Sequence, residues 1–141
     1  MDTWILPANA NQHADYYYDV DGAFETLKTI FWGQPNAITN IAIGDIVYIY
    51  KSAPVQAIVW KCKVLAVNIK QKEVDIDDSA FEYGKRGIPD FCIKITALCK
   101  YYGEARDKLS YAELRKNGLN TTMQGPLRAN AQLLAYINSV V

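Results

Sequence analysis

The sequence predicts an α+β fold, a mixed β-barrel of five or more strands flanked by short helices. Three observations predict it: most apolar segments have the length and composition of strands, helical patterns are few and short, and strands and helices do not alternate in a β-α-β rhythm. With 141 residues, half of them hydrophobic and 21% charged, the chain has the size and composition of one globular domain. We therefore expect residues 1–141 to form a single domain.

The first part of the chain predicts a strand, a loop and a helix. Residues 3–6 favour a short strand, and the polar run 8–15 has the composition of a surface loop. Either Asp19 or Asp21 can cap the helix that follows. Its apolar positions recur at the spacing of one buried helical face: Phe24, Leu27, and Ile30 or Phe31. We expect this helix to end before Gly33.

Two long strands are predicted in the middle of the chain. A tight turn at 43–45 leads into 46–50, where consecutive β-branched and aromatic residues leave no polar face, as in a strand covered on both sides. We interpret this segment as the central strand. Residues 56–68 predict a second strand with one face in water, because two kinds of side chain alternate along it: Trp60, Cys62 and Val64 against Lys61 and Lys63.

Further strands are predicted at 74–81 and 90–101. The segment 83–89 between them is rich in turn residues and contains Lys85 and Arg86, so it predicts an exposed basic loop.

Two helices are predicted near the C-terminus. Ser110 and Glu113 form a capping box, which begins a short helix that stops at Asn117-Gly118. Gly125-Pro126 is expected to open the last helix, since proline is well tolerated in a first helical turn. Its apolar stripe consists of Leu127, Ala131, Leu134 and Ile137.

Charge and aromatic content limit the function classes. The 15 basic and 15 acidic side chains cancel, whereas proteins that hold nucleic acid by its phosphates usually carry a basic excess. Any contact with nucleic acid must therefore be local. Ten tyrosines, three tryptophans and four phenylalanines supply flat surfaces for packing or for stacking a planar ligand. Because the run 16–18 consists of three tyrosines, we expect at least one of them to be exposed.

The expected location is the cytoplasm. No apolar run reaches the roughly 18 residues of a membrane-spanning helix, and the chain does not open with a signal segment. Cys62, Cys92 and Cys99 lie in apolar stretches without metal-ligand spacing, so we expect reduced core thiols and no metal site.

Catalytic patterns are weak. His13, the only histidine, lies in a polar loop, and neither a nucleophile elbow nor a phosphate-binding glycine loop occurs. Asp75, Asp77 and Asp78 lack the glycine and glutamate of a calcium loop. We expect no catalytic residue and no cofactor.

Four segments together point to a known family. They are Trp4-Ile5-Leu6-Pro7-Ala8-Asn9, Ile30-Phe31-Trp32-Gly33-Gln34, Gly44-Asp45-Ile46-Val47-Tyr48-Ile49-Tyr50 and Met123-Gln124-Gly125-Pro126-Leu127-Arg128. In this order the sequence resembles the EVE family of the PUA-like superfamily, which also holds the YTH and ASCH domains. The four segments span nearly the whole chain. The glycine-aspartate strand and the Trp-x-Gln element are the most specific.

The resemblance implies a PUA-like barrel that binds one extruded, modified base of DNA or RNA, such as methylated or hydroxymethylated cytosine, without catalysis. Such domains can act as readers in modification-dependent restriction, so a separate nuclease or other effector is an implied partner. By position, the resemblance assigns the base pocket to Trp32, Gln34, Asn36, Asn9, Tyr50, Lys51 and Ser52. Candidates for contact with the nucleic-acid backbone are Lys85, Arg86 and Arg128.

Each of these residues also has a purely structural interpretation. Trp32 can be a core residue, since tryptophans are highly buried on average. Loop amides often bond only to neighbouring backbone, and most lysines are simply solvated. Arg128 is expected just inside a helix start, where it would oppose the helix dipole unless a phosphate or a carboxylate pairs with it.

Two other functions stay open. Exposed tyrosines and the basic loop would suit a protein–protein adaptor. The relation to ASCH domains also leaves an RNA-directed hydrolase as a further alternative.

Overall fold

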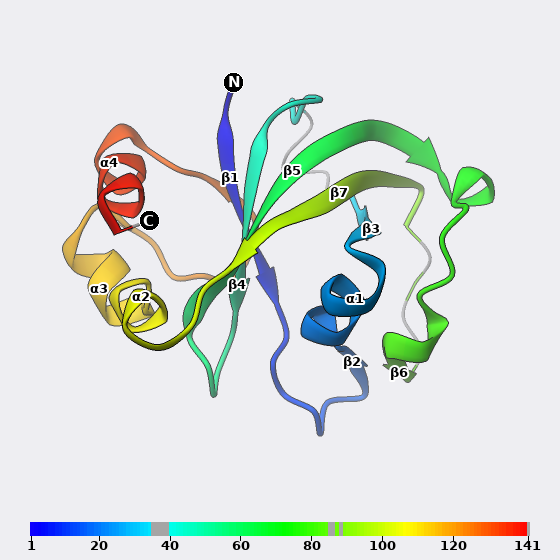
Figure 1. Ribbon diagram of the computed structural model, residues 1–141, viewed down its shortest axis with the longest axis horizontal. Helices are drawn as coiled ribbons and strands as arrows, with labels where there is room; N and C mark the ends of the chain where they lie inside the picture. Colours follow the sequence, from blue (N-terminus) through cyan, green and yellow to red (C-terminus); the bar gives the residue numbers. More distant parts are fainter. Residues whose placement is uncertain (35–39, 85–86, 88, 141) are drawn as a thin grey trace.

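The computed structural model describes residues 1–34, 40–84, 87 and 89–140. Its main feature is a six-stranded mixed sheet in the order β3-β7-β5-β4-β1-β8. The strands are β1 (Thr3–Ala8), β3 (Thr29–Gly33), β4 (Ile46–Lys51), β5 (Ala57–Lys70), β7 (Phe91–Lys100) and β8 (Leu127–Arg128). Among the described strands of this sheet, β1 and β4 pair in parallel and the other pairs are antiparallel. Figure 1 shows β5 and β7 curving as a long arch.

The central strand β4 is covered on both faces, as its sequence predicted. Val47 and Ile49 belong to one hydrophobic cluster, while Tyr48 and Tyr50 belong to a second cluster on the opposite face. The turn before β4 also forms as predicted: Gly44 has φ +93°, a conformation open to glycine but strained for other residues. The sheet therefore separates two apolar cores.

The first core fills the concave side of the arch, where helix α1 (Val20–Leu27) packs (Figure 1). Asp19 caps this helix, because its side chain accepts a hydrogen bond from Gly22 N. The helix ends at Leu27, so the predicted extension to Ile30 or Phe31 is wrong: both residues lie in β3. The same spacing of apolar residues fits a helix end followed by a strand.

The second core lies under three C-terminal helices: α2 (Gly103–Lys108), α3 (Tyr111–Lys116) and α4 (Ala131–Val140). Ser110 caps α3 as predicted. The last helix begins later than predicted, since Asn130 Oδ1 accepts from Leu133 N and so forms the cap. Residues Leu127–Arg128 instead pair with β1 as β8, and Leu133 replaces Leu134 as the buried position.

A small ribbon completes the fold beside α1. It consists of β2 (Tyr16–Tyr18) and β6 (Glu82–Gly84), which pair antiparallel. The strand predicted at 74–81 is absent, because this segment is a loop that ends in a 3-10 turn at Ser79–Phe81. Its alternating acidic and apolar residues imitate a strand but have no neighbouring strand to pair with among the described residues.

The predicted α+β class with a mixed sheet and short flanking helices is confirmed. The hydrogen bonding does not close a barrel, since β3 and β8 form the two edges of the sheet in the described part of the chain. Two of the three cysteines are buried as expected, but Cys99 is exposed. No helix in the described ranges is long and apolar enough to cross a membrane.

Candidate functional site

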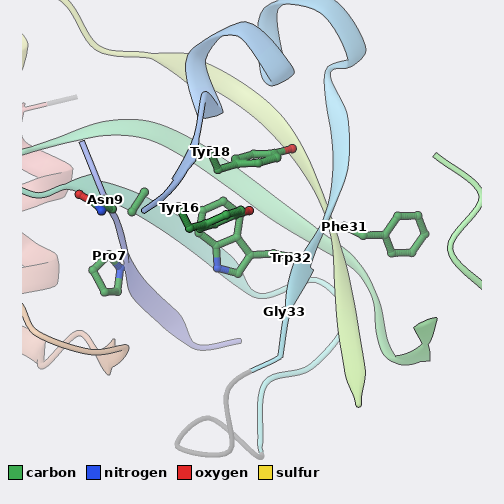
Figure 2. Close-up of a pocket in the computed structure, with 8 residues that line it drawn as sticks. Pro7, Asn9, Tyr16, Tyr18, Phe31, Trp32 and Gly33 are labelled. Atoms are coloured by element: carbon green, nitrogen blue, oxygen red, sulfur yellow. The ribbon is translucent and has the colours of Figure 1, made fainter. Parts of the chain in front are cut away.

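A pocket of about 240 Å³ lies where the curved sheet brings its edge strand β3 back towards the end of β1. The β2 strand forms its third wall. The lining residues are Pro7, Ala8, Asn9, Tyr16, Tyr18, Phe31, Trp32 and Gly33. Figure 2 shows Tyr16, Tyr18 and Trp32 gathered on one side of β3, while the Phe31 ring points away from them. The volume is below the roughly 300–1,000 Å³ of sites for drug-sized ligands, so it suits a group of about one ring system.

Trp32 is the largest side chain of this pocket. Alternation along β3 sends it to the concave side, where it packs half-buried against the first core. The other two tryptophans, Trp4 and Trp60, are buried as predicted, and their indole N–H groups donate to Asp45 and Asp21. Among the described residues, the indole N–H of Trp32 has no acceptor. Within the described residues it is therefore the tryptophan that retains an unused donor.

Tyr18 fixes the orientation of Trp32. Its ring lies edge-on to the indole, with centroids 6.0 Å apart and planes at 89°. The Tyr18 hydroxyl donates to Asp78 Oδ2 at 2.7 Å, which anchors the ring from the loop before β6. Burial, together with the hydrogen bond and charge of Asp78, raises the pKa of the Tyr18 phenol above its ordinary value. The phenol therefore stays protonated at neutral pH.

Asn9 supplies polar atoms at the rim. Its Oδ1 accepts a hydrogen bond from Asn11 N at 2.9 Å, and its Nδ2 has no acceptor in the described part of the chain. The side chain is thus bound locally through its oxygen, while its amide nitrogen can still donate to a ligand.

Gln34 is not among the described residues that line the pocket. Gln34 exchanges two hydrogen bonds with Asn68, at 3.0 and 2.9 Å, and so ties the end of β3 to β5. Asn36 lies outside the described residues. The basic pair Lys85 and Arg86, predicted to contact the nucleic-acid backbone, also lies outside them.

The segment Tyr50-Lys51-Ser52 supports the pocket without lining it. Tyr50 points into the second core, on the face of the sheet opposite to the first core. Lys51 forms an ion pair with Asp21 at 2.9 Å. The Ser52 hydroxyl accepts from Ala10 N at 3.2 Å, and Ser52 N donates to Ala8 O at 2.9 Å. These bonds hold the chain just after β1, where Ala8 and Asn9 meet the pocket.

Arg128 lies elsewhere. It is in β8, at the other edge of the sheet, and its guanidinium contacts Asp2 Oδ1 at 2.6 Å. The sequence predicted a helix start for Arg128, which is wrong, but its alternative of a carboxylate partner is confirmed. Its contact with the nucleic-acid backbone stays a prediction.

Sequence reasoning considered a stacking role for the run 16–18 but did not assign Tyr16 and Tyr18 to the pocket. Tyr17 is 8% exposed, and Tyr16 and Tyr18 are half-buried, so the expected exposed tyrosine is absent from the run. The available signal was alternation: in a strand, the first and third residues of a run of three share one face. Alternation applies only if the run is a strand, and a strand needs a partner. The tertiary structure provides that partner, β6.

The described lining carries neutral polar groups: two phenols, one indole and one carboxamide. Among the described lining residues there is no carboxylate, imidazole or amine. In the described ranges no three His, Cys, Asp or Glu side chains are grouped so that they could hold a metal ion. The pocket thus offers flat apolar surfaces with a few neutral hydrogen-bonding groups.

Solved structures share this architecture at low sequence identity. A Rhodopseudomonas palustris protein solved by NMR is 11% identical, with a TM-score of 0.64 over 99% of this chain and 92% of its own. The protein PSPTO5229 of Pseudomonas syringae, solved by X-ray crystallography, is 14% identical, with a TM-score of 0.62 over 98% of each chain. An ASCH protein from Zymomonas mobilis is 10% identical, with a TM-score of 0.60 over 98% of this chain and 94% of its own. No family model and no curated protein matches the sequence.

Proposed function

We propose that this chain, which has the PUA-like fold of those structures, binds one modified base extruded from a nucleic-acid strand and leaves the base chemically unchanged. The base enters the pocket between β1, β2 and β3. Methylated or hydroxymethylated cytosine in DNA is the proposed ligand. A separate nuclease or other effector would act on the marked strand, as in modification-dependent restriction.

The observation that supports this proposal best is the pocket of Trp32. It combines an aromatic plate, a perpendicular tyrosine that fixes the plate, and an indole N–H without an acceptor in the described part of the chain. A base needs a surface to stack on and a donor or acceptor for its edge. Trp32 offers both, and Asn9 adds an amide donor at the rim.

The energies fit this role. Extruding a base costs a few kcal/mol, and stacking on an aromatic side chain returns about 1–3 kcal/mol per base. One stacked base with one or two hydrogen bonds therefore roughly balances the cost. A methyl group buried against the tyrosine rings would add about 0.8 kcal/mol, which corresponds to about a fourfold preference for the methylated base.

Trp32→Ala tests the proposal. It should weaken binding of a short strand with one modified cytosine about 5- to 150-fold, because the stacking energy is lost. Binding is measured by the anisotropy of a dye on the strand, since the variant lacks the tryptophan whose quenching would otherwise report it. DNA and RNA strands with plain, methylated and hydroxymethylated cytosine are compared.

Trp60→Phe is the matched control. Trp60 is 6% exposed and donates to Asp21 at 2.7 Å, so this variant should lower the thermal midpoint yet bind as the original protein does. Trp32→Ala should show the opposite pattern, with weaker binding and a small change in midpoint. If both variants lose stability and binding in parallel, Trp32 is a core residue and the proposal fails.

The ASCH match makes an RNA-directed hydrolase the second candidate. It predicts that the purified protein shortens RNA, and that Asn9→Ala or Tyr18→Phe abolishes the cleavage while the fold persists. Binding without turnover of RNA, followed by gel electrophoresis, would exclude it in favour of the reader.

A further inference from the structure

A second cavity lies on the other side of the β2–β6 ribbon. Its volume is about 360 Å³, and it is lined by Gln12, Tyr17, Asp19 and Tyr83. The ribbon is therefore a shared wall: Tyr16 and Tyr18 face the first pocket, and Tyr17 between them faces the second. The proposed base pocket makes no use of this cavity.

Two tyrosine rings form its flat surface. Tyr17 and Tyr83 are register partners in the ribbon, with ring centroids 6.0 Å apart and planes tilted by 30°. Tyr17 is buried at 8% exposure, whereas Tyr83 is 56% exposed. Tyr17 thus supports Tyr83, whose ring remains open to a planar ligand.

The polar groups of the cavity select the kind of ligand. Asp19 Oδ1 accepts from Gly22 N at 3.0 Å, and among the described residues Oδ2 has no partner. The carboxylate repels phosphate and accepts from N–H groups, as acidic side chains do from the exocyclic amino group of cytosine. Gln12 can both donate and accept. The cavity therefore suits the amino-bearing edge of a base.

We propose that this cavity is a second subsite, which binds a base next to the extruded one on the same strand. This base stacks on Tyr83, and its exocyclic amino group donates a hydrogen bond to the Asp19 carboxylate. The subsite rests on the proposed function, since it reads the sequence context of the modified base. It favours cytosine, adenine or guanine over thymine or uracil, which lack that amino group.

The chain offers conservative variants for the test. Asp19→Asn keeps the helix cap, because asparagine caps as well as aspartate, but replaces the carboxylate. Tyr83→Ala removes the stacking ring. Tyr102→Ala is the matched control, since Tyr102 is also exposed, at 68%, and lines neither cavity.

Binding is measured with six-nucleotide strands that hold one modified cytosine flanked by cytosine or by thymine. Tyr83→Ala should weaken binding of the cytosine-flanked strand about tenfold, and Tyr102→Ala should not. Asp19→Asn should remove the preference for cytosine flanks while the thermal midpoint stays near that of the original protein. Isotope-edited NMR with free cytidine and uridine follows the Tyr83 ring and the Trp32 indole separately.

The outcomes separate the two proposals. If Trp32→Ala weakens binding but Tyr83→Ala matches Tyr102→Ala, the second subsite is excluded and the base pocket stands. If cytidine shifts the Tyr83 signals and Trp32→Ala changes nothing, the base pocket fails and the second cavity binds bases without it. If no strand binds and no signal moves, both are wrong.

Discussion

At the scale of single residues, tryptophans and carboxylates act in pairs. Asp45 is 3% exposed and accepts from Trp4 Nε1 at 3.0 Å, Asp2 N at 3.0 Å and Ala42 N at 2.9 Å. Burial alone would raise the pKa of Asp45, but these hydrogen bonds outweigh it and hold the pKa below 3.8, its ordinary value. The ionised carboxylate therefore connects the first strand to the turn before β4.

This pairing predicts the acid sensitivity of the fold. Because the folded pKa is lowered, the stability that Asp45 contributes is present above pH 3.8 and is lost as pH falls through the folded value. Asp45→Asn should cost about 2–4 kcal/mol at pH 7, since charged hydrogen bonds are lost or weakened. Urea unfolding at pH 7 and pH 3 measures the free energy of unfolding of the original protein and of Asp45→Asn. The difference in this free energy between the two proteins should be smaller at pH 3 than at pH 7. An equal difference at both pH values would contradict the pairing.

The three tryptophans show that residue type alone does not decide whether an indole N–H is bonded within the fold. Trp4 and Trp60 each use the indole N–H within the fold, whereas Trp32 does not within the described residues. Nothing in the immediate sequence distinguishes them, because the acceptors Asp45 and Asp21 are 41 and 39 residues away along the chain.

At the scale of elements, the β2–β6 ribbon shapes both cavities, because it lies between them and contributes a wall to each. Gly84 lies opposite Tyr16 in this ribbon and has φ +94°. A Cβ at Gly84 would overlap the carbonyl oxygen of Asp15, so glycine is required both for its conformation and for space.

Gly84→Ala should therefore push β2 and β6 apart and disturb both cavities. We expect a loss of about 1–3 kcal/mol in the free energy of unfolding and weaker binding of modified strands. Gly87→Ala is the control from the same region, since a Cβ there meets none of the described residues within 4 Å. Thermal unfolding and strand anisotropy measure the two effects. Equal behaviour of the two variants would show that the ribbon does not shape the cavities.

The elements also show where sequence patterns mislead. Strands at 46–50 and 56–68 and the capped helix after Ser110 are confirmed, because alternation and capping are local properties. The predicted strand at 74–81 and the early start of the last helix are wrong. Leu127 and Arg128 pair with β1, more than a hundred residues earlier in the chain, and no local pattern reveals such a partner.

At the scale of the whole molecule, several lysines of the sheet lie on the face opposite to the pocket. The net charge is zero, and Lys61, Lys63 and Lys94 project from the face of the sheet opposite to Val64 and Trp32. Lys94 lies 5.7 Å from the centroid of the Phe31 ring, which points away from the pocket in Figure 2. The described lining of the pocket therefore offers little attraction to phosphates.

Binding should accordingly depend weakly on salt. One or two phosphate contacts to a single strand give a slope of about −1 in a plot of log affinity against log salt concentration. Between 50 and 200 mM salt we expect less than about a tenfold loss, which anisotropy titrations measure. A loss of a thousandfold or more would mean that a basic surface carries the binding.

The sequence by itself determined the α+β class, the central strand with two buried faces and the capping residues of two helices. These depend on periodicity and capping within a few residues. Trp32 became a candidate through the resemblance to the EVE family, not through a local pattern. Only the tertiary structure decided which aromatic side chains share a pocket, because curvature of the sheet brings β3 to β1, and β6 holds β2 beside them. The tertiary structure also places Tyr50 in the opposite core and Arg128 at the far edge of the sheet. Strand pairing and curvature depend on contacts between segments remote in sequence, and that is the physical reason why local patterns predicted elements but not the pocket that they form together.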